Sequence, residues 1–360
     1  MKKCKICVYA IAKNESKFVQ RFYDSVKEAD EICILDTGSE DDTVKLLREL
    51  GVNVYEEKII PWRFDVARNR SLDLVSDDID ICVCLDLDEV LLPGWREEIE
   101  KAWEPNVTKI IYNYNWLLDK DNKPLVNFYY EKIHSRHGYK WIHPVHEVLT
   151  YVGEGDEIKK IVPSITVNHY PDIKKSRSSY LPLLELSVKE NPLDDRNMHY
   201  LGREYMYYGK WDQAIDTLIK HLNLKSATWK DERAASMRFI SRCYIALKRY
   251  DEAKMWLDKA IREAPYLRDA YVERAMLEYQ LGNYQDVIKY AEDALKIKNK
   301  PKTYINEIFS FDNTIYDVLS IAYYYLGNKE KAVFYVNLAT KMNPSDERLK
   351  NNKKIFLEDK

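Results

Sequence analysis

The stretch that decides the fold is Ile81-Cys82-Val83-Cys84-Leu85-Asp86-Leu87-Asp88-Glu89, an apolar run that ends in carboxylates. Such a run indicates a buried parallel strand, and its acidic end marks the carboxyl edge of the sheet, where open α/β sheets bind ligands. On an extended chain Asp86 and Asp88 point to the same side. Convergent carboxylates repel each other unless a cation lies between them, and such oxygen ligands suit Mg²⁺ or Mn²⁺. A solvated acidic turn is the alternative.

Length and charge narrow the class of protein. The 360 residues allow two or three domains, and a formal net charge of −3 provides no general attraction to nucleic acid or anionic membranes. No run approaches the ~18 apolar residues of a membrane span, and the first residues do not resemble a signal peptide. We therefore expect a cytoplasmic protein.

The six cysteines admit two interpretations. Their Cys-x-x-Cys and Cys-x-Cys spacings are those of some zinc sites, but most of them lie within predicted strands. We therefore expect reduced thiols in the core.

The elements around the acidic run alternate between strand and helix. Strands are predicted at 5–12, 31–36, 52–55 and 81–85, with helices at 15–29, 43–50, 62–75 and 95–103. This order predicts a Rossmann-like, mostly parallel α/β sheet. Residues 109–167 carry alternating aromatic side chains, which indicate antiparallel strands.

Beyond Pro171 the pattern is helical and repetitive. Equivalent small or branched residues recur at Ala214, Ala253, Val287 and Ala332, each shortly after a turn. The interval from Ala253 to Val287 is the roughly 34 residues of a tetratricopeptide (TPR) repeat, and the other intervals are longer. We expect an all-α, TPR-like solenoid over 191–360, with inserted turns near 298–312.

Several short motifs follow one another through the first 170 residues. Together they resemble the family-2 glycosyltransferases of the GT-A fold, and most closely the bacterial subgroup whose members include peptide glycosyltransferases with helical-repeat tails. The matching stretches are Ala12-Lys13-Asn14-Glu15, Asp36-Thr37-Gly38-Ser39-x-Asp41-x-Thr43, Ala67-Arg68-Asn69, Asp86-x-Asp88-Glu89, His146-Glu147 and His169-Tyr170.

This resemblance implies where the nucleotide would bind. Ile11, Lys13, Glu15 and Asp36 would frame the nucleobase, and Arg68 would meet the base or a phosphate. The alternative for Asp36 is capping of the turn that follows it, and the alternative for Arg68 is a surface cation.

The resemblance also assigns the cation and the chemistry. Asp86 would lie near the ribose and the water shell of Mn²⁺ or Mg²⁺, Asp88 would bind the ion, and His169 would be a further ligand. Glu147 would be the base that takes the acceptor's proton, with His146 as the runner-up. Their alternatives are a salt-bridged Glu147 and a His169 held at a domain boundary. Trp116 and Trp141 would stack on a sugar or lie in the core.

The sequence thus predicts a GT-A domain over 1–175, a linker helix over 176–190 and the repeats over 191–360. The expected reaction is inverting, metal-dependent transfer from a UDP-sugar, with glucose or N-acetylglucosamine favoured. The acceptor would be a protein, peptide or glycan held by the repeats, which would alternatively form a homodimer. Rival interpretations are a nucleotidyltransferase, which usually has a glycine-rich phosphate loop, and a TPR scaffold with a degenerate catalytic domain.

Overall fold

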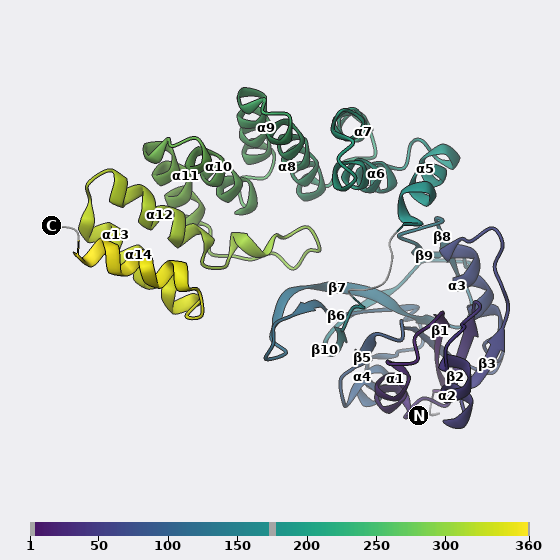
Figure 1. Ribbon diagram of the computed structural model, residues 1–360. Coiled ribbons are helices and arrows are strands. Elements are labelled where there is room, and N and C mark those ends of the chain that lie inside the picture. Colours follow the sequence, from purple (N-terminus) through teal and green to yellow (C-terminus); the bar gives the residue numbers. More distant parts are fainter. Residues whose placement is uncertain (1–3, 173–177, 359–360) are drawn as a thin grey trace. The chain divides into compact units, whose positions relative to one another are not determined.

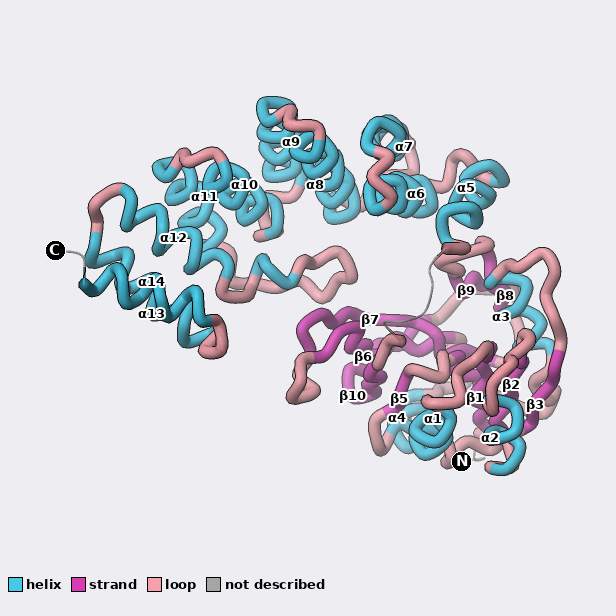
Figure 2. Tube along the Cα trace, in the orientation of Figure 1, coloured by secondary structure: helices cyan, strands magenta, loops and turns pink. Residues whose placement is uncertain are grey.

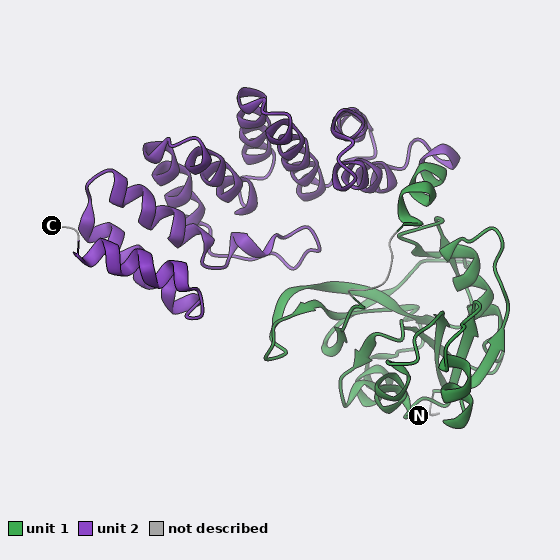
Figure 3. Ribbon diagram, viewed as in Figure 1, with its two compact units in different colours: residues 1–187 green, residues 188–360 purple. Residues whose placement is uncertain are grey.

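One eight-stranded sheet organises the first part of the chain, and the remainder contains helices (Figures 1 and 2). The computed structural model describes residues 4–172 and 178–358. The chain divides into unit 1, Met1–Ser187, and unit 2, Val188–Lys360 (Figure 3).

The sheet has the order β3-β2-β1-β4-β7-β6-β10-β5, and a separate hairpin joins β8 to β9. The strands β3, β2, β1 and β4 are parallel to one another, while β7 runs antiparallel to both β4 and β6. The strand bounds are β1 Ile6–Ala12, β2 Glu31–Asp36, β3 Asn53–Glu56, β4 Ile81–Cys84, β5 Glu89–Leu91, β6 Lys109–Leu118, β7 Pro124–Ser135, β8 Tyr139–Ile142, β9 Val148–Tyr151 and β10 Lys159–His169. The predicted mostly parallel α/β sheet is therefore confirmed in its N-terminal half.

The expectation of antiparallel strands throughout 109–167 is wrong for the pairing of β10 with β6, although β10 runs antiparallel to its other neighbour, β5. This strand pairs with β6 in parallel, from Lys159 opposite Lys109 onward. The β8–β9 hairpin lies between β7 and β10 in the chain and outside the main sheet. A parallel return of this kind leaves the side-chain alternation unchanged, so the aromatic pattern could not distinguish the two directions.

Both faces of the sheet are covered, which is why its central strands are apolar at successive positions. The helices of unit 1 are α1 Val19–Val26, α2 Thr43–Glu49, α3 Phe64–Asp73 and α4 Trp95–Ala102, and α5 Tyr180–Glu190 spans the boundary between the units. Ile6 and Val8 of β1 pack in one core with residues of α1, α2 and α4. Cys7 and Tyr9 pack in a second core with α3 and the β8–β9 hairpin.

Cysteine thiols occupy part of that second core. Cys7, Cys33, Cys82 and Cys84 are buried there, as expected for core thiols. Burial raises the pKa of Cys33 and Cys82 to about 12 and that of Cys84 to about 11, so these side chains stay protonated at neutral pH.

Unit 2 consists of helical hairpins, and the predicted TPR-like solenoid is confirmed. Its helices are α6 Asp195–Tyr207, α7 Trp211–Asn223, α8 Lys230–Ala246, α9 Tyr250–Glu263, α10 Asp269–Gln280, α11 Tyr284–Lys296, α12 Thr314–Tyr325, α13 Lys329–Met342 and α14 Glu347–Glu358. Each hairpin turn contains a residue with positive φ, namely Gly209, Lys248, Gly282 or Gly327. Glycine adopts this conformation without strain, which explains the recurring glycines of the sequence pattern. Among the described residues, none of the helices combines the length and the apolar composition that crossing a bilayer requires.

Close helix packing in the first repeat predicts the effect of one substitution. A Cβ at Gly202 would lie 2.5 Å from Leu218 Cγ, where α6 crosses α7. Gly202→Ala should therefore lower the free energy of unfolding by about 1–3 kcal/mol, despite alanine's higher helix propensity. Chemical denaturation of the parent, Gly202→Ala, Leu218→Ala and the double variant checks this. In the Leu218→Ala background the alanine should cost little, and an equal cost in both backgrounds would contradict the steric account.

Candidate active site

A turn holds the acidic motif at the end of β4. The Glu89 N–H donates to the Asp86 carbonyl at 2.9 Å, and the Asp86 N–H donates to Glu89 Oε2 at 2.9 Å. The prediction of an extended Asp-Leu-Asp is therefore wrong. The Glu89 side chain accepts from the Asp86 N–H, whereas in an extended strand this N–H would pair with a neighbouring strand. Leu87 is nevertheless buried in the core, and Asp86 and Asp88 stay partly exposed.

Glu89 is the buried anchor of this turn. Its Oε1 accepts hydrogen bonds from the Tyr114 hydroxyl at 2.6 Å and from Lys132 Nζ at 3.2 Å. Burial disfavours the ammonium of Lys132, but the charges of Glu89 and Asp86 outweigh burial and raise the pKa of Lys132. The anchor is therefore charge-compensated within the protein.

Sequence reasoning missed Lys132. It lies on β7 in the same alternating series as Phe128 and Tyr130, and its ammonium is 3.6 Å from Asp86 Oδ2. A lysine among inward-facing positions of a strand requires a buried carboxylate partner. A lysine in the alternating series of Phe128 and Tyr130 was therefore the feature of the sequence that could have identified Lys132.

Arg68 joins two of the predicted site residues. It lies on α3 with 3% of its surface exposed, and its Nη2 donates to Asp86 Oδ1 at 2.5 Å while its Nε donates to Glu147 Oε1 at 3.0 Å. Burial disfavours the guanidinium, but Asp86, Cys84 and Glu147 outweigh it and raise the pKa of Arg68. The planar fork thus holds the acidic motif and the candidate base together.

The loop that carries Glu147 is attached to the same helix. Asn69 exchanges two hydrogen bonds with the backbone of Trp141, and the Phe64 N–H donates to the Pro144 carbonyl at 2.9 Å. Glu147 is thereby set opposite Arg68. His146, the runner-up, has positive φ, and its ring packs edge-on against Tyr180 with centroids 5.6 Å apart.

Backbone pairing brings His169 to the acidic motif. In the β5–β10 ladder His169 lies opposite Glu89, and its Nε2 is 3.5 Å from Asp88 Oδ2. Its Nδ1 donates to the Trp116 carbonyl at 3.0 Å. Metal-binding histidines commonly donate their second nitrogen in this way, so Asp88 and His169 fit a shared cation. Burial disfavours the imidazolium, but Asp88 outweighs it and raises the pKa of His169.

The residues predicted to frame the nucleobase lie at or just after the ends of β1 and β2. Asp36 is buried, and its Oδ1 accepts from the backbone of Gly38 and Ser39 at 2.9 and 2.8 Å, as expected of a turn cap. The Glu15 N–H donates to Thr43 Oγ1 at 2.8 Å, which ties the two loops together. Ile11 lies half-buried one residue before the end of β1, and Lys13, directly after the strand, is exposed.

The two tryptophans separate into different environments. Trp141 is buried and its Nε1 donates to the Tyr9 hydroxyl at 2.9 Å, so it belongs to the core. Trp116 is 48% exposed and stacks on His169 with centroids 4.4 Å apart. Of the two tryptophans, Trp116 is therefore the one that lies beside the candidate cation ligands and is open to solvent.

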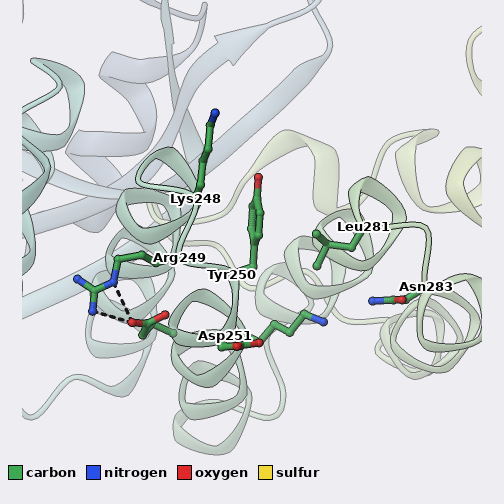
Figure 4. Close-up of a pocket in the computed structure, with 8 residues that line it drawn as sticks. Lys248, Arg249, Tyr250, Asp251, Leu281 and Asn283 are labelled. Carbon is green, nitrogen blue, oxygen red and sulfur yellow. Dashed lines mark hydrogen bonds and ion pairs between the residues drawn. The ribbon is translucent and has the colours of Figure 1, made fainter.

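A surface hollow of about 560 Å³ lies in unit 2 between the turns of two hairpins (Figure 4). Three of its charged residues are paired, since Arg249 donates to Glu252 and Lys254 to Glu278. It contains none of the predicted site residues. Its lining is Lys248, Arg249, Tyr250, Asp251, Glu252, Lys254, Leu281 and Asn283.

The buried position of Arg68 predicts a large effect on stability. Arg68→Met should lower the free energy of unfolding by about 3–5 kcal/mol, because Asp86 and Glu147 would lose the cation between them. The matched control is Arg70→Met on the same helix, whose pair with Glu57 is exposed and should contribute below about 1 kcal/mol. Denaturant titration of both variants checks this. Equal costs at the two arginines would contradict the assigned role.

Comparison with known proteins identifies the two parts of the chain. Residues 7–145 match the model of glycosyl transferase family 2, and residues 239–266 and 314–346 match tetratricopeptide repeats. The first match ends before Glu147 and His169.

Individual proteins are similar to parts of this chain. A glycosyltransferase of Rickettsia conorii, described as uncharacterized, is 36% identical over 97 residues, covering 27% of this chain and 33% of that protein. Glycosyltransferase SunS of Bacillus phage SPbeta is 25% identical over 301 residues, covering 78% of this chain and 67% of that protein. The solved structure of MamA is 22% identical, with a TM-score of 0.38, and covers 49% of this chain and 96% of MamA. The chain spans 24% of the length of another curated relative, outer dynein arm-docking complex subunit 4 of Danio rerio, and 33% of the length of the Rickettsia conorii protein. Residues 7–145 thus belong to glycosyl transferase family 2, and tetratricopeptide repeats follow them along the chain.

Proposed function

We propose that this chain is an inverting, metal-dependent glycosyltransferase that transfers a sugar from a UDP-sugar to a macromolecular acceptor. One observation carries the proposal, namely that Arg68 binds Asp86 and Glu147 at once. A donor-side carboxylate and a candidate base are thereby held on one cation, at the carboxyl end of β4. This arrangement, within a domain of glycosyl transferase family 2, favours transfer chemistry over a degenerate scaffold.

Asp88 and His169 would hold the cation, Mn²⁺ or Mg²⁺. Asp86 is the weaker direct ligand, because its Oδ1 binds Arg68 and its Oδ2 faces Lys132. This charge balance favours Asp86 for the ribose and for waters around the ion. When bound, the cation neutralises the diphosphate that leaves with uridine. Ile11, Lys13, Glu15 and Asp36 would surround the base.

Glu147 would take the acceptor's proton. As an acceptor oxygen, nitrogen or sulfur attacks the anomeric carbon, its proton passes to a Glu147 carboxylate oxygen, while the bond from that carbon to the phosphate oxygen breaks on the opposite face. Because Oε1 accepts from Arg68 Nε, the second oxygen is the natural proton acceptor. Trp116 would support a sugar ring by stacking.

The repeats would supply acceptor selection. TPR-like hairpins create extended surfaces for a protein, peptide or glycan, or for a second copy of this chain. Glucose and N-acetylglucosamine are the favoured sugars.

The cation assignment predicts loss of donor turnover. Asp88→Asn should abolish Mn²⁺-dependent release of UDP from UDP-glucose or UDP-N-acetylglucosamine, because the ion loses its charged ligand. Slow hydrolysis of the donor needs no acceptor and serves as the measurement. The control, Asp78→Asn, removes an exposed carboxylate from unit 1 and should leave turnover unchanged. Full turnover by Asp88→Asn in the presence of a chelator would refute the assignment.

The base assignment predicts a rate effect without a binding effect. Glu147→Gln keeps an oxygen for Arg68 Nε but cannot take a proton, so the rate at saturating donor should fall about 10²–10⁴-fold. UDP affinity, measured by calorimetry, should be nearly unchanged. His146→Gln should cost less. If Glu147→Gln retains most of its rate, or loses it only through UDP binding, Glu147 is a counter-ion of Arg68 and no base.

A further inference from the structure

A second cluster of ligand-type side chains lies within unit 2. Asp195, His221 and Glu232 each direct one ligand atom toward the others, and these atoms all lie within 4.8 Å of one another. Asp195 opens α6, His221 lies in the last turn of α7, and Glu232 lies in the first turn of α8. Because consecutive helices of a repeat run antiparallel, the start of α6, the end of α7 and the start of α8 lie at the same end of the helix layer, which brings these three residues together.

His221 has an unsatisfied buried nitrogen aimed at this cluster. Its side chain is fully buried, and its Nε2 makes no hydrogen bond. The nearest carboxylate oxygen, Glu232 Oε1, is 3.4 Å away and lacks hydrogen-bond geometry. A buried polar atom without a partner is costly, and an unrecorded ion is one of its standard explanations.

The other ring nitrogen of His221 is held by a polar relay. Ser236 Oγ lies 2.9 Å from His221 Nδ1 and 2.7 Å from His199 Nδ1. Because one hydroxyl proton serves two ring nitrogens, Ser236 donates to one ring and accepts from the other, and a metal on His221 requires that it donate to His199. His221 Nδ1–H then donates to Ser236 Oγ, which leaves the Nε2 lone pair facing the carboxylates. This is the orientation that a second contact imposes on a metal-binding histidine.

Glu232 is oriented by a residue far along the chain. The Tyr304 hydroxyl donates to Glu232 Oε2 at 3.0 Å, and Oε1 remains on the His221 side. Tyr304 lies in the segment that joins α11 to α12, before its short 3-10 helix Ile308–Ser310. The cluster therefore connects the first repeats with that inserted segment.

We propose that Asp195, His221 and Glu232 bind a divalent transition metal, with Zn²⁺ as the best match. An imidazole and two carboxylates are borderline-soft and hard ligands that Zn²⁺ accepts, with water completing the shell. Zn–ligand bonds of ~2.0–2.2 Å place tetrahedral ligand atoms roughly 3.3 Å apart, so the side chains need to close by about 1.5 Å at most. The ion would hold α6, α7 and α8 together. It would have a structural role in unit 2 and no part in the transfer reaction proposed for unit 1. The competing explanation is a direct pairing of His221 with Glu232, without metal.

Zinc titration of the full-length chain tests the site. Asp88→Asn serves as the parent, so that zinc binding at the candidate active site is weakened. After chelator treatment, calorimetry with ZnCl₂ should detect one bound ion in unit 2. At a free zinc concentration about a hundredfold above Kd, the melting temperature should rise by roughly 5–10 °C.

Three variants separate the ion from a salt bridge. In this parent, Asp195→Asn and His221→Gln should each abolish the zinc-dependent rise, and Ser236→Ala should weaken zinc binding about 10–100-fold. The control His137→Gln, at an exposed histidine of unit 1, should change neither the zinc-dependent rise in melting temperature nor the zinc affinity. Asp195 is partly exposed at a helix end, so Asp195→Asn retains the fold even if His221→Gln does not. Unchanged zinc affinity and stabilisation in Asp195→Asn, or no zinc-dependent rise in the parent, would overturn the proposal. Donor turnover plays no part in either readout, so this outcome is independent of the proposed transferase activity.

Discussion

The candidate active site depends on a buried guanidinium. Arg68 contacts Asp86 at 2.5 Å and Glu147 at 3.0 Å, and these three residues come from a helix, a strand-end turn and a loop that are distant in sequence. Removing a cation from water is costly, and the cost is offset here because two carboxylates share its fork. The same ion pairs fix where each carboxylate can reach. Glu147 is therefore both a counter-ion of Arg68 and the candidate base.

The turn that carries Asp86 and Asp88 is stabilised by the buried side chain of Glu89. The Glu89 carboxylate accepts hydrogen bonds from the Tyr114 hydroxyl, the Lys132 ammonium and the Asp86 N–H. This polar network holds the turn. His169 is positioned differently, because the pairing of β10 with β5 places it opposite Glu89. Backbone pairing thus places one candidate cation ligand, and side-chain compensation orients the other. Such support is what keeps a site in one geometry.

Unit 2 repeats one hairpin geometry but varies its buried polar groups. Small residues such as Ala214, Ala253 and Ala332 are fully buried in these hairpins. The first repeats also bury His199, His221 and Ser236, which a purely apolar solenoid would not need. Because stability in repeat arrays is nearly local, a polar cluster affects mainly its own and adjacent repeats.

The sequence by itself determined the parts that rest on local periodicity. The apolar run from Ile81 predicted a central strand, and the recurring turn and alanine positions predicted the solenoid, because strand and helix periods are local properties of the chain. Motif order also selected Asp88, His169, Arg68 and Glu147 as candidates. Tertiary structure alone decided that β10 runs parallel to β6, that Asp86 to Glu89 forms a turn, and that Lys132 faces that turn. It also brought Asp195, His221 and Glu232 together, since none of these contacts follows from spacing along the chain. Each depends on which distant segment supplies the compensating charge or hydrogen bond, and that choice is made only when the burial of polar groups must be satisfied in three dimensions.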